Sequence, residues 1–354
     1  MLKLGSMSLQ TQRVSMRDVA KAVGVSVSAV SLAIKNSPRV SAPVRQKIQE
    51  KIRELGYQPD PILKALCHYR RSKITAPVSA ELAWINCWPK PKELRAFREF
   101  ELYWQGALEE ARRAGFRLEE FRLQEYESFA RLEQVLRARN INGILIPPHG
   151  TLWPANWPEF RWNDFCIVRF GHSVAHPRAH LVTSDQLTDG MIAFENIWHK
   201  GYRRIAYVTT RDTTSRGTRF SAGFLLAQLK AGARARLYPL LMSDKKQLKE
   251  DQKQLTVWLR NIKPDAIFTD YPGLHRVLAS CGYQVPQDIG LAVASVLDGG
   301  ATAGIDQNSK EIGKAAIQLL ISLINHNERG IPDVCRKLLI EGRWVDGHTL
   351  PGKK

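Results

Sequence analysis

The sequence predicts an all-α helix-turn-helix headpiece followed by a bilobed α/β body, on the strength of three observations. Three short helical patterns, separated by turn residues, occupy residues 14–57. Lys and Arg outnumber Asp and Glu by 10 among residues 1–75, so more than half of the net charge of +18 lies in the first fifth of the chain. From residue 79 onward, short apolar runs alternate with helical patterns, as a parallel sheet with crossover helices requires.

The first two helices are defined by their capping residues. Ser15 and Asp18 have the spacing of a capping box, which predicts a helix that begins near Met16. Gly24 supplies the backbone freedom for a tight turn, and Ser26 then caps a second helix. The pattern is therefore helix, tight turn, helix.

The second helix has two faces, and a third helix follows it. Val30, Ala33 and Ile34 recur on the inward side at helical spacing. The outward side carries five residues: Val27, Ser28, Ser31, Leu32 and Lys35. The third helix is capped by Ser41 and ended by Gly56. Three short helices of this kind form a helix-turn-helix, whose second helix is suited to enter a DNA major groove.

A plain three-helix subdomain that binds nothing is the alternative interpretation of this region. The first 75 residues contain 14 Lys and Arg against four acidic residues. Such a concentration of cations is suited to a phosphate backbone, because bound Lys and Arg release its condensed counterions. The headpiece is therefore expected to bind double-stranded DNA.

Residues 14–57 closely resemble the headpiece of the LacI/GalR family of bacterial transcriptional repressors, through the segments RDVAKAVGVSVSAVS, NSPRVS and IRELGYQP. The resemblance implies operator DNA as the partner. It also implies a DNA-facing surface made of Ser26, Val27, Ser28, Ser31, Leu32 and Lys35. Base readout would fall chiefly to Val27, Ser28 and Leu32. Leucine cannot donate a hydrogen bond to guanine, so Leu32 indicates an operator sequence of its own.

Residues 58–77 are expected to link the headpiece to the body. Asp60 as N-cap and Pro61 as first helical residue predict a short helix that is unstable alone. The family resemblance implies a hinge helix, which orders on DNA when it pairs with the hinge helix of a second subunit in a homodimer. Leu66 occupies the position that relatives wedge into the minor groove. An inert tether is the alternative.

The body, residues 78–354, is expected to contain two similar α/β lobes, in which strands and helices alternate. The first lobe should contain strands 81–88, 116–123, 143–147, 164–170 and 180–185 and helices 100–114 and 130–139. After a helix at 187–200 the order recurs, and the second lobe should contain strands 203–210, 235–241, 265–270 and 290–296 and helices 220–230, 247–261 and 273–281. Helix 310–324 and a single last strand, 338–344, complete the body.

The body resembles, more weakly, the periplasmic-binding-protein-like effector domain of the same family, on GYRRIAYVTT, RFSAGFLLAQ, KPDAIFTD, GYQVPQDIGLAVASV and EIGKAAIQLL. Ligands of such folds lie between the lobes, at the carboxyl ends of strands. Carried over by position, the ligand-binding residues are Trp88, Asp185, Arg219 and Asp270. Ser295 stands where many relatives have Asp, and Asp298 offers a nearby substitute.

These side chains indicate a small polar effector. Two carboxylates and a guanidinium suit the hydroxyls of a sugar or of another small polar metabolite. Trp88 could stack equally on a sugar face or a nucleobase, so a nucleobase is the alternative ligand. The alternative role for Trp88 itself is packing in the core or at the rim of the body. The resemblance implies that ligand binding controls DNA binding.

Other classes of protein fit the sequence less well. Neither G-x-S-x-G nor G-x-G-x-x-G occurs, so an enzyme and a bound cofactor are not expected. A secreted sugar-binding protein would lack the basic headpiece and would need an export signal. Five scattered cysteines and the lack of a long apolar run favour a cytoplasmic protein without a membrane span. Residues 1–13 are expected to be a disordered lead.

Three histidines, His172, His176 and His180, are spaced four residues apart, which on a helix would align metal ligands. Pro177 lies between them and Gly171 precedes them, so an ordinary loop is the favoured interpretation. No metal site is therefore expected.

Overall fold

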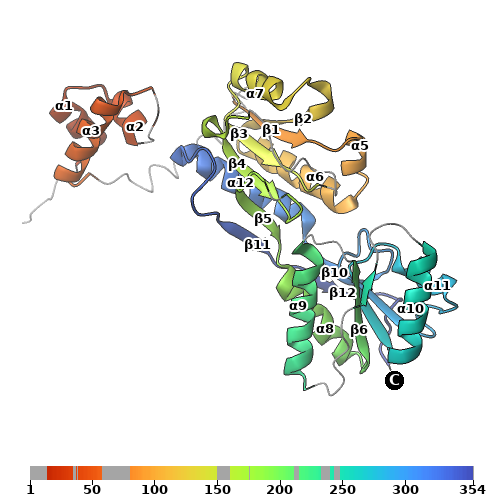
Figure 1. Ribbon diagram of the computed structural model, residues 1–354. Helices are drawn as coiled ribbons and strands as arrows, with labels where there is room; N and C mark the ends of the chain where they lie inside the picture. Colours follow the sequence, from red (N-terminus) through yellow and green to blue (C-terminus); the bar gives the residue numbers. More distant parts are fainter. Residues whose placement is uncertain are drawn as a thin grey trace, which may run out of the picture. The chain divides into compact units, whose positions relative to one another are not determined.

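The computed structural model describes residues 14–34, 37, 39–57, 80–149, 160–174, 176–210, 215–232, 240–242 and 248–353. Its N-terminal part is a three-helix headpiece, with helices α1 (Met16–Val23), α2 (Val27–Ile34) and α3 (Ala42–Glu54) (Figure 1). The apolar core of the headpiece consists of Val19, Ala20, Val30, Ala33, Val40 and Ile48. The predicted helix-turn-helix is confirmed. The predicted lead and the predicted hinge helix with Leu66 lie outside the described residues.

The local signals of the headpiece act as predicted at its first two helices. The Ser15 backbone amide donates to Asp18 Oδ2 at 2.8 Å and the Ser15 hydroxyl donates to the same oxygen at 2.7 Å. These bonds lower the pKa of the Asp18 carboxyl. Gly24 adopts the left-handed conformation at φ 74°, which turns the chain after α1. The Ser26 hydroxyl accepts the Ala29 amide at 3.1 Å and caps α2.

The predicted side-chain cap on α3 is wrong. Ser41 occupies the N-cap position, but its hydroxyl accepts no capping hydrogen bond. A cap of this kind accepts the amide of the second or third helical residue; the second residue here is Pro43, which has none, so only the amide of Val44 remains for such a bond.

The body contains two six-stranded sheets, one in each lobe (Figure 1). The first-lobe sheet has the order β11-β5-β4-β3-β1-β2, and all its neighbouring strands are parallel. Its strands are β1 (Ala80–Asn86), β2 (Phe116–Arg122), β3 (Gly143–Ile146), β4 (Cys166–Phe170), β5 (His180–Ser184) and β11 (Lys337–Ile340). The helices of this lobe are α5 (Pro91–Leu94), α6 (Arg98–Arg113), α7 (Phe129–Ala138) and α12 (Ser309–His326), with single 3-10 turns at Leu123–Glu125 and Trp162–Asp164.

Helices cover both faces of the first-lobe sheet. Leu132 and Leu136 of α7 pack with Ile85 and Ile144 in one buried cluster. Helices α6 and α12 are linked to each other by an ion pair between Glu109 and Lys310, 2.7 Å between Oε2 and Nζ. This two-faced covering explains why the inner strands β3, β4 and β5 are buried along almost their whole length, whereas the edge strands β2 and β11 are more exposed.

The second-lobe sheet has the order β12-β10-β9-β8-β6-β7 and is parallel except for the β10 and β12 pair. Its strands are β6 (Ile205–Thr210), β7 (Leu240–Met242), β8 (Ala266–Thr269), β9 (Gly290–Val293), β10 (Ala303–Asp306) and β12 (Arg343–Val345). The helices are α8 (Gln186–His199), α9 (Ser215–Lys230), α10 (Leu248–Ile262) and α11 (Leu274–Ser280). One buried cluster joins α8 and α9 to the sheet, and another joins α10 and α11 to it.

The order of the predicted elements is confirmed, but three details are corrected. Strand β1 ends at Asn86, so Trp88 lies in the following loop. Strand β10 and helix α5 were not predicted. The predicted last strand, 338–344, is two strands in different lobes, because the chain crosses between the lobes at residues 341–342.

The chain therefore crosses between the lobes three times, at residues 184–186, 306–309 and 340–343. Hydrogen bonds connect the three crossings. The buried Ser184 hydroxyl donates to Gln307 Oε1 at 2.9 Å, and the Asp185 amide donates to the Ile340 carbonyl at 2.8 Å. The Asn308 side-chain amide donates to the Glu341 carbonyl at 2.8 Å. The crossings thus form one bonded hinge.

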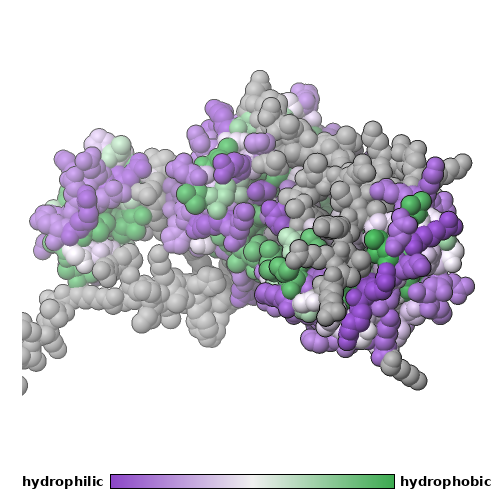
Figure 2. Space-filling model, turned by 60° about the horizontal axis from the view of Figure 1, so that its bottom comes forward, coloured by the Kyte–Doolittle hydropathy of each residue, from purple (hydrophilic) through white to green (hydrophobic). Residues whose placement is uncertain are grey.

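Hydrophilic residues cover much of the visible face of the molecule, with smaller apolar patches between them (Figure 2). Within the described ranges, no helix has the length and apolar content needed to span a membrane.

Candidate functional site

The outward face of α2 is the candidate DNA-reading surface. Val27 is 40% exposed and Ser28 is exposed, whereas Ser31 is half-buried. Leu32 is also half-buried and packs against the headpiece core, so it is less outward than predicted. Lys35 lies outside the described residues. The exposed part of this surface, Val27 and Ser28, therefore carries small side chains and no charge.

The cations of the headpiece fall into two groups, those that are exposed and those that are engaged within the headpiece. Lys21, Arg39 and Lys47 are exposed. Arg45 donates to the Val40 carbonyl at 3.1 Å, and Lys51 forms an ion pair with Glu54 at 2.7 Å. The first group is the better candidate for phosphate contacts, because the second group already stabilises α3 and the turn before it.

The second candidate site is the region where the two lobes of the body face each other, called the cleft below. Parallel strands end at the same edge of a sheet, so side chains that follow β1, β5, β6 and β8 gather at the two facing edges. The loop after β9 reaches the other lobe directly, since Asp298 accepts the backbone amides of Arg98 and Glu99 at 3.0 Å each. The carboxylate expected to stand in for a ligand-binding Asp is therefore engaged by the first-lobe backbone.

Trp88 lies at the first-lobe edge of this cleft and is half-buried. Its indole Nε1 donates to the Pro148 carbonyl at 2.9 Å. Its ring lies against His149, with 5.8 Å between centroids and 28° between planes, and against Phe97 at 5.8 Å. Burial lowers the pKa of His149 to about 3, so this imidazole is neutral at physiological pH.

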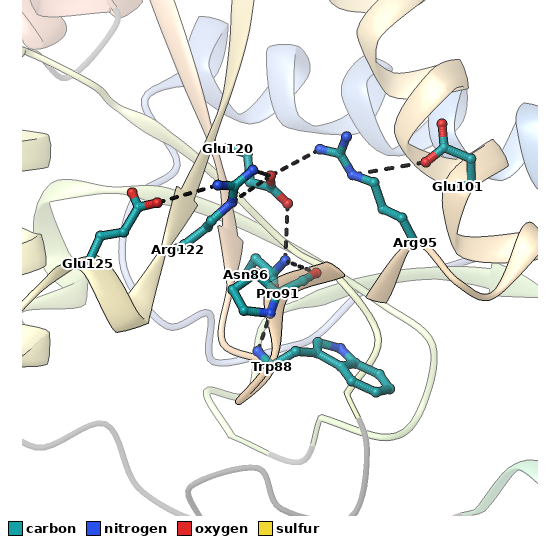
Figure 3. Close-up of polar contacts among 8 residues, drawn as sticks. All are labelled: Asn86, Trp88, Pro91, Arg95, Glu101, Glu120, Arg122 and Glu125. Atoms are coloured by element: carbon teal, nitrogen blue, oxygen red, sulfur yellow. Dashed lines mark hydrogen bonds and ion pairs between the residues drawn. The ribbon is translucent and has the colours of Figure 1, made fainter. Parts of the chain in front are cut away.

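A polar network holds the loop that carries Trp88 (Figure 3). Asn86 is fully buried and donates from Nδ2 to the Pro91 carbonyl and to Glu120 Oε1, both at 3.0 Å. Its Oδ1 accepts the Trp88 amide at 3.0 Å. Glu120 also pairs with Arg95 at 3.2 Å and with Arg122 at 3.1 Å. Because the polar groups of Asn86 and Glu120 bind one another and the loop backbone, their role is to position the loop. The group that this loop can offer to a ligand is the Trp88 ring.

The guanidinium of Arg95 connects this network to the aromatic core. It lies 4.2 Å from the centroid of the Trp104 ring, and Trp104 packs edge-on against Trp84 at 5.4 Å. Arg95 also lies 4.0 Å from Glu101, between Nε and Oε2 (Figure 3). The start of α6 is thereby fixed next to the Trp88 loop.

Arg219 enters the cleft from α9 of the second lobe and is half-buried, which lowers the pKa of its guanidinium. On the opposite side, burial and, to a smaller extent, the charges of Arg219 and Arg169 together lower the pKa of His172 to about 4. Arg169 donates to the Ala179 carbonyl at 3.2 Å and so holds the loop after β4. The cleft is therefore cationic at this end.

The two predicted carboxylates differ in their surroundings. Asp185 caps α8: its Oδ1 accepts the Thr188 amide at 3.3 Å and its Oδ2 accepts the Thr188 hydroxyl at 2.7 Å. Asp270 follows β8 and is half-buried. The backbone amide of its neighbour Tyr271 donates a hydrogen bond to Thr269 Oγ1 at 2.9 Å. Asp185 thus caps a helix, whereas Asp270 lies directly after a strand.

Sequence reasoning missed several polar residues that lie at or beside the cleft. His149 and His172 follow β3 and β4, and Gln307 follows β10. Their position directly after a strand is a signal that the sequence contains. A shallow hollow elsewhere on the second lobe, lined by Leu259, Arg260, Lys263, Pro264 and Tyr283, contains none of the predicted site residues.

The three spaced histidines do not lie on a helix, as predicted. His180 belongs to β5, is buried and accepts the Arg336 amide at 3.0 Å, whereas His176 is exposed. Among the residues that the structure describes, no group of three or more His, Cys, Asp or Glu side chains could hold a metal ion.

Comparison with known proteins matches two family models to the chain. Residues 15–60 match the bacterial regulatory proteins of the lacI family, and residues 194–349 match the periplasmic-binding-protein-like domain. The ribose operon repressor of Escherichia coli strain K12 is 26% identical over 331 residues, which cover 88% of this chain and 93% of that protein.

Two solved structures share the fold along nearly the whole chain. The transcriptional regulator CelR in complex with cellobiose has a TM-score of 0.59 at 20% identity, over 95% of this chain and 100% of that one. The lac repressor dimer bound to operator and the anti-inducer ONPF has a TM-score of 0.54 at 16% identity, over 96% and 100%. A helix-turn-helix headpiece and a bilobed body thus occur together in these proteins.

Proposed function

The chain belongs to the LacI family of bacterial transcriptional regulators, and from this premise we propose that it is a repressor controlled by a small polar ligand. The observation that carries the proposal is the pairing of an exposed, small-residue α2 face in a cationic headpiece with a two-lobed body. We propose the domain division 14–57 for the headpiece, 58–77 for the linker with its hinge helix and 78–354 for the body. The protein is proposed to act as a homodimer on operator DNA.

Base readout is assigned to α2, and a selection experiment tests it. Duplexes with random sequence are selected on the native protein and on variants, and the recovered motifs are compared. Val27→Ala and Ser28→Ala should change the preferred base at one position in each half-site, by about 1 to 3 kcal/mol of discrimination, because both side chains are exposed on the reading face.

Lys47→Ala is the matched control for the readout variants. Lys47 is exposed on α3, and a phosphate contact carries no base information, so this variant should bind all sequences more weakly and recover the native motif. Native motifs from both α2 variants would contradict the assignment.

We propose a carbohydrate as the effector. Trp88 offers a ring, Asp270 an acceptor and Arg219 a planar donor, which together suit a polyhydroxylated ring. Two similar proteins support this choice, since one is the repressor of a ribose operon and the other is a regulator in complex with cellobiose. A nucleobase is the second candidate, because the Trp88 ring suits it equally.

Thermal unfolding in the presence of candidate ligands tests this assignment. D-ribose, cellobiose and adenine are added separately to the full chain, and a ligand at 100 times its Kd should stabilise the native protein by about 2.7 kcal/mol. The double variant Arg219→Ala, Asp270→Ala should lose the response while it retains ligand-free DNA binding. The control pair Arg260→Ala, Asp288→Ala, two exposed residues of the same lobe, should respond like the native protein. A normal response from the cleft variant would exclude these residues.

Control of DNA binding is proposed to operate through the hinge between the lobes. A ligand can shift the arrangement of the lobes only by its differential affinity for the two arrangements. DNA must then change the ligand affinity by the same factor. Calorimetry of the effective ligand with and without the selected duplex measures this factor, and equal affinities would remove the allosteric part of the proposal.

A further inference from the structure

The start of helix α6 contains no capping side chain of its own. The N-cap position is occupied by Phe97, which has no polar side-chain atom, and residues 98 and 99 are the first two of the helix. The first amides of a helix have no partner within the helix and need an acceptor from elsewhere. In this chain the acceptor comes from a residue about 200 positions away.

Asp298 of the second lobe supplies both acceptors. Its Oδ1 accepts the Arg98 amide and its Oδ2 accepts the Glu99 amide, each at 3.0 Å. A carboxylate at a helix N-terminus is further stabilised by the partial positive charge of the helix dipole. Both oxygens of one side chain therefore hold one helix end of the opposite lobe.

The loop that presents Asp298 is held by its own lobe. The Asp298 amide donates to the Ser295 hydroxyl at 3.3 Å, and the Gly299 amide donates to the Ser295 carbonyl at 2.8 Å. The Val296 amide donates to the Ile305 carbonyl of β10 at 3.0 Å. Asp298 therefore moves together with the second lobe. Its contact with α6 consequently depends on how the two lobes are arranged.

We propose that Asp298 is an inter-lobe clasp, meaning a residue that stabilises the closed arrangement of the lobes by capping α6 of the first lobe. When the lobes separate, the two amides of α6 exchange a charged acceptor for water, and the dipole contact is lost. The closed arrangement is therefore favoured by the protein itself, before any contribution from a ligand. Any effect of this clasp on DNA binding rests on the proposed function. The clasp itself rests only on the contact between Asp298 and α6.

Hydrogen exchange of the full-length protein tests the cap. In Asp298→Ala the amides of Arg98 and Glu99 should exchange about 2- to 30-fold faster, the range produced by loss of a side-chain cap. Asp298→Asn keeps one acceptor and should give an intermediate rate, which also serves where Asp298→Ala does not fold. Asp288→Ala is the matched control, since Asp288 accepts the Gln284 amide at 2.7 Å within its own loop. It should leave exchange at α6 unchanged.

Energy transfer between the lobes tests the closure. Dyes are placed through unnatural amino acids at Arg131 and Arg260, two exposed positions on α7 and α10. Asp298→Ala should shift the population toward the longer distance and Asp298→Asn should shift it less. Unchanged exchange at α6 would overturn the proposal. Faster exchange with an unchanged distance would also overturn it, because Asp298 would then cap α6 without closing the lobes. Neither readout uses DNA or ligand, so these outcomes are separate from a failure of the proposed function.

Discussion

Raising the salt concentration from about 50 to about 200 mM is expected to weaken binding to duplex DNA by about 10³- to 10⁵-fold, the loss found for 6 to 10 phosphate contacts. The headpiece is the source of this effect. Lys and Arg outnumber acids by 10 in the first 75 residues, and Lys21, Arg39 and Lys47 are exposed. Two headpieces in a homodimer double the number of such contacts.

Fluorescence anisotropy of a labelled duplex, titrated at several concentrations of KCl, measures this dependence. The logarithm of affinity should fall linearly with the logarithm of salt, with a slope of about −0.9 for each phosphate contact. Lys47→Ala should reduce the slope by about 2 in a dimer, one contact for each headpiece. Arg260→Ala, an exposed change on the body, should leave it unchanged. A slope near zero would contradict the interpretation of the headpiece charge.

The headpiece could be predicted in detail because its signals are local. Ser15, Asp18, Gly24 and Ser26 act within three or four residues of the groups that they satisfy. At Ser41 the missing side-chain bond also has a local contribution, since Pro43 removes one of the two amides that the cap could use. Short-range capping depends on the sequence alone and needs no knowledge of the rest of the fold.

The lobes could be predicted as a pattern, but their connections could not. Alternating apolar runs indicate parallel strands, yet the run 338–344 does not reveal that its two halves enter different sheets. The position after a strand indicated Asp185 and Asp270 equally. The structure adds that Thr188 contacts both oxygens of Asp185, so this acid caps α8. Contacts between residues far apart in the chain, such as Asp298 with α6, have no signature in the sequence.

The second large expected effect is a pH dependence of stability, and it comes from Asp189, a buried acid that binds one crossing of the hinge. Asp189 lies in α8 with no exposed surface, and its Oδ1 accepts the Gly342 amide at 2.8 Å. A Cβ atom at residue 342 would lie 2.5 Å from the same oxygen, so glycine is required at this crossing. The other oxygen, Oδ2, is buried with no hydrogen-bond partner in the part of the chain that the structure describes.

Burial is the main cause that raises the pKa of Asp189 to about 7; the charges of Asp185, Glu341 and Glu99 add to it, and the Gly342 amide acts in the opposite direction. The native protein therefore holds a proton that the unfolded chain releases near pH 4. Because the native state binds more protons between about pH 4 and 7, the free energy of unfolding should fall as pH rises through this window, by up to about 4 kcal/mol.

Asp189→Asn should remove this pH dependence and be more stable than the native protein at pH 8, by about 2 to 4 kcal/mol, with little difference at pH 4. The amide oxygen can still accept from Gly342, and the neutral side chain has no ionised form to bury. All nine tryptophans lie after residue 80, so tryptophan fluorescence during urea unfolding between pH 4 and 8 follows the body alone. Asp288→Asn, an exposed change in the same lobe, should keep the native profile. Parallel profiles for the native protein and Asp189→Asn would show that Asp189 does not hold a proton in the hinge.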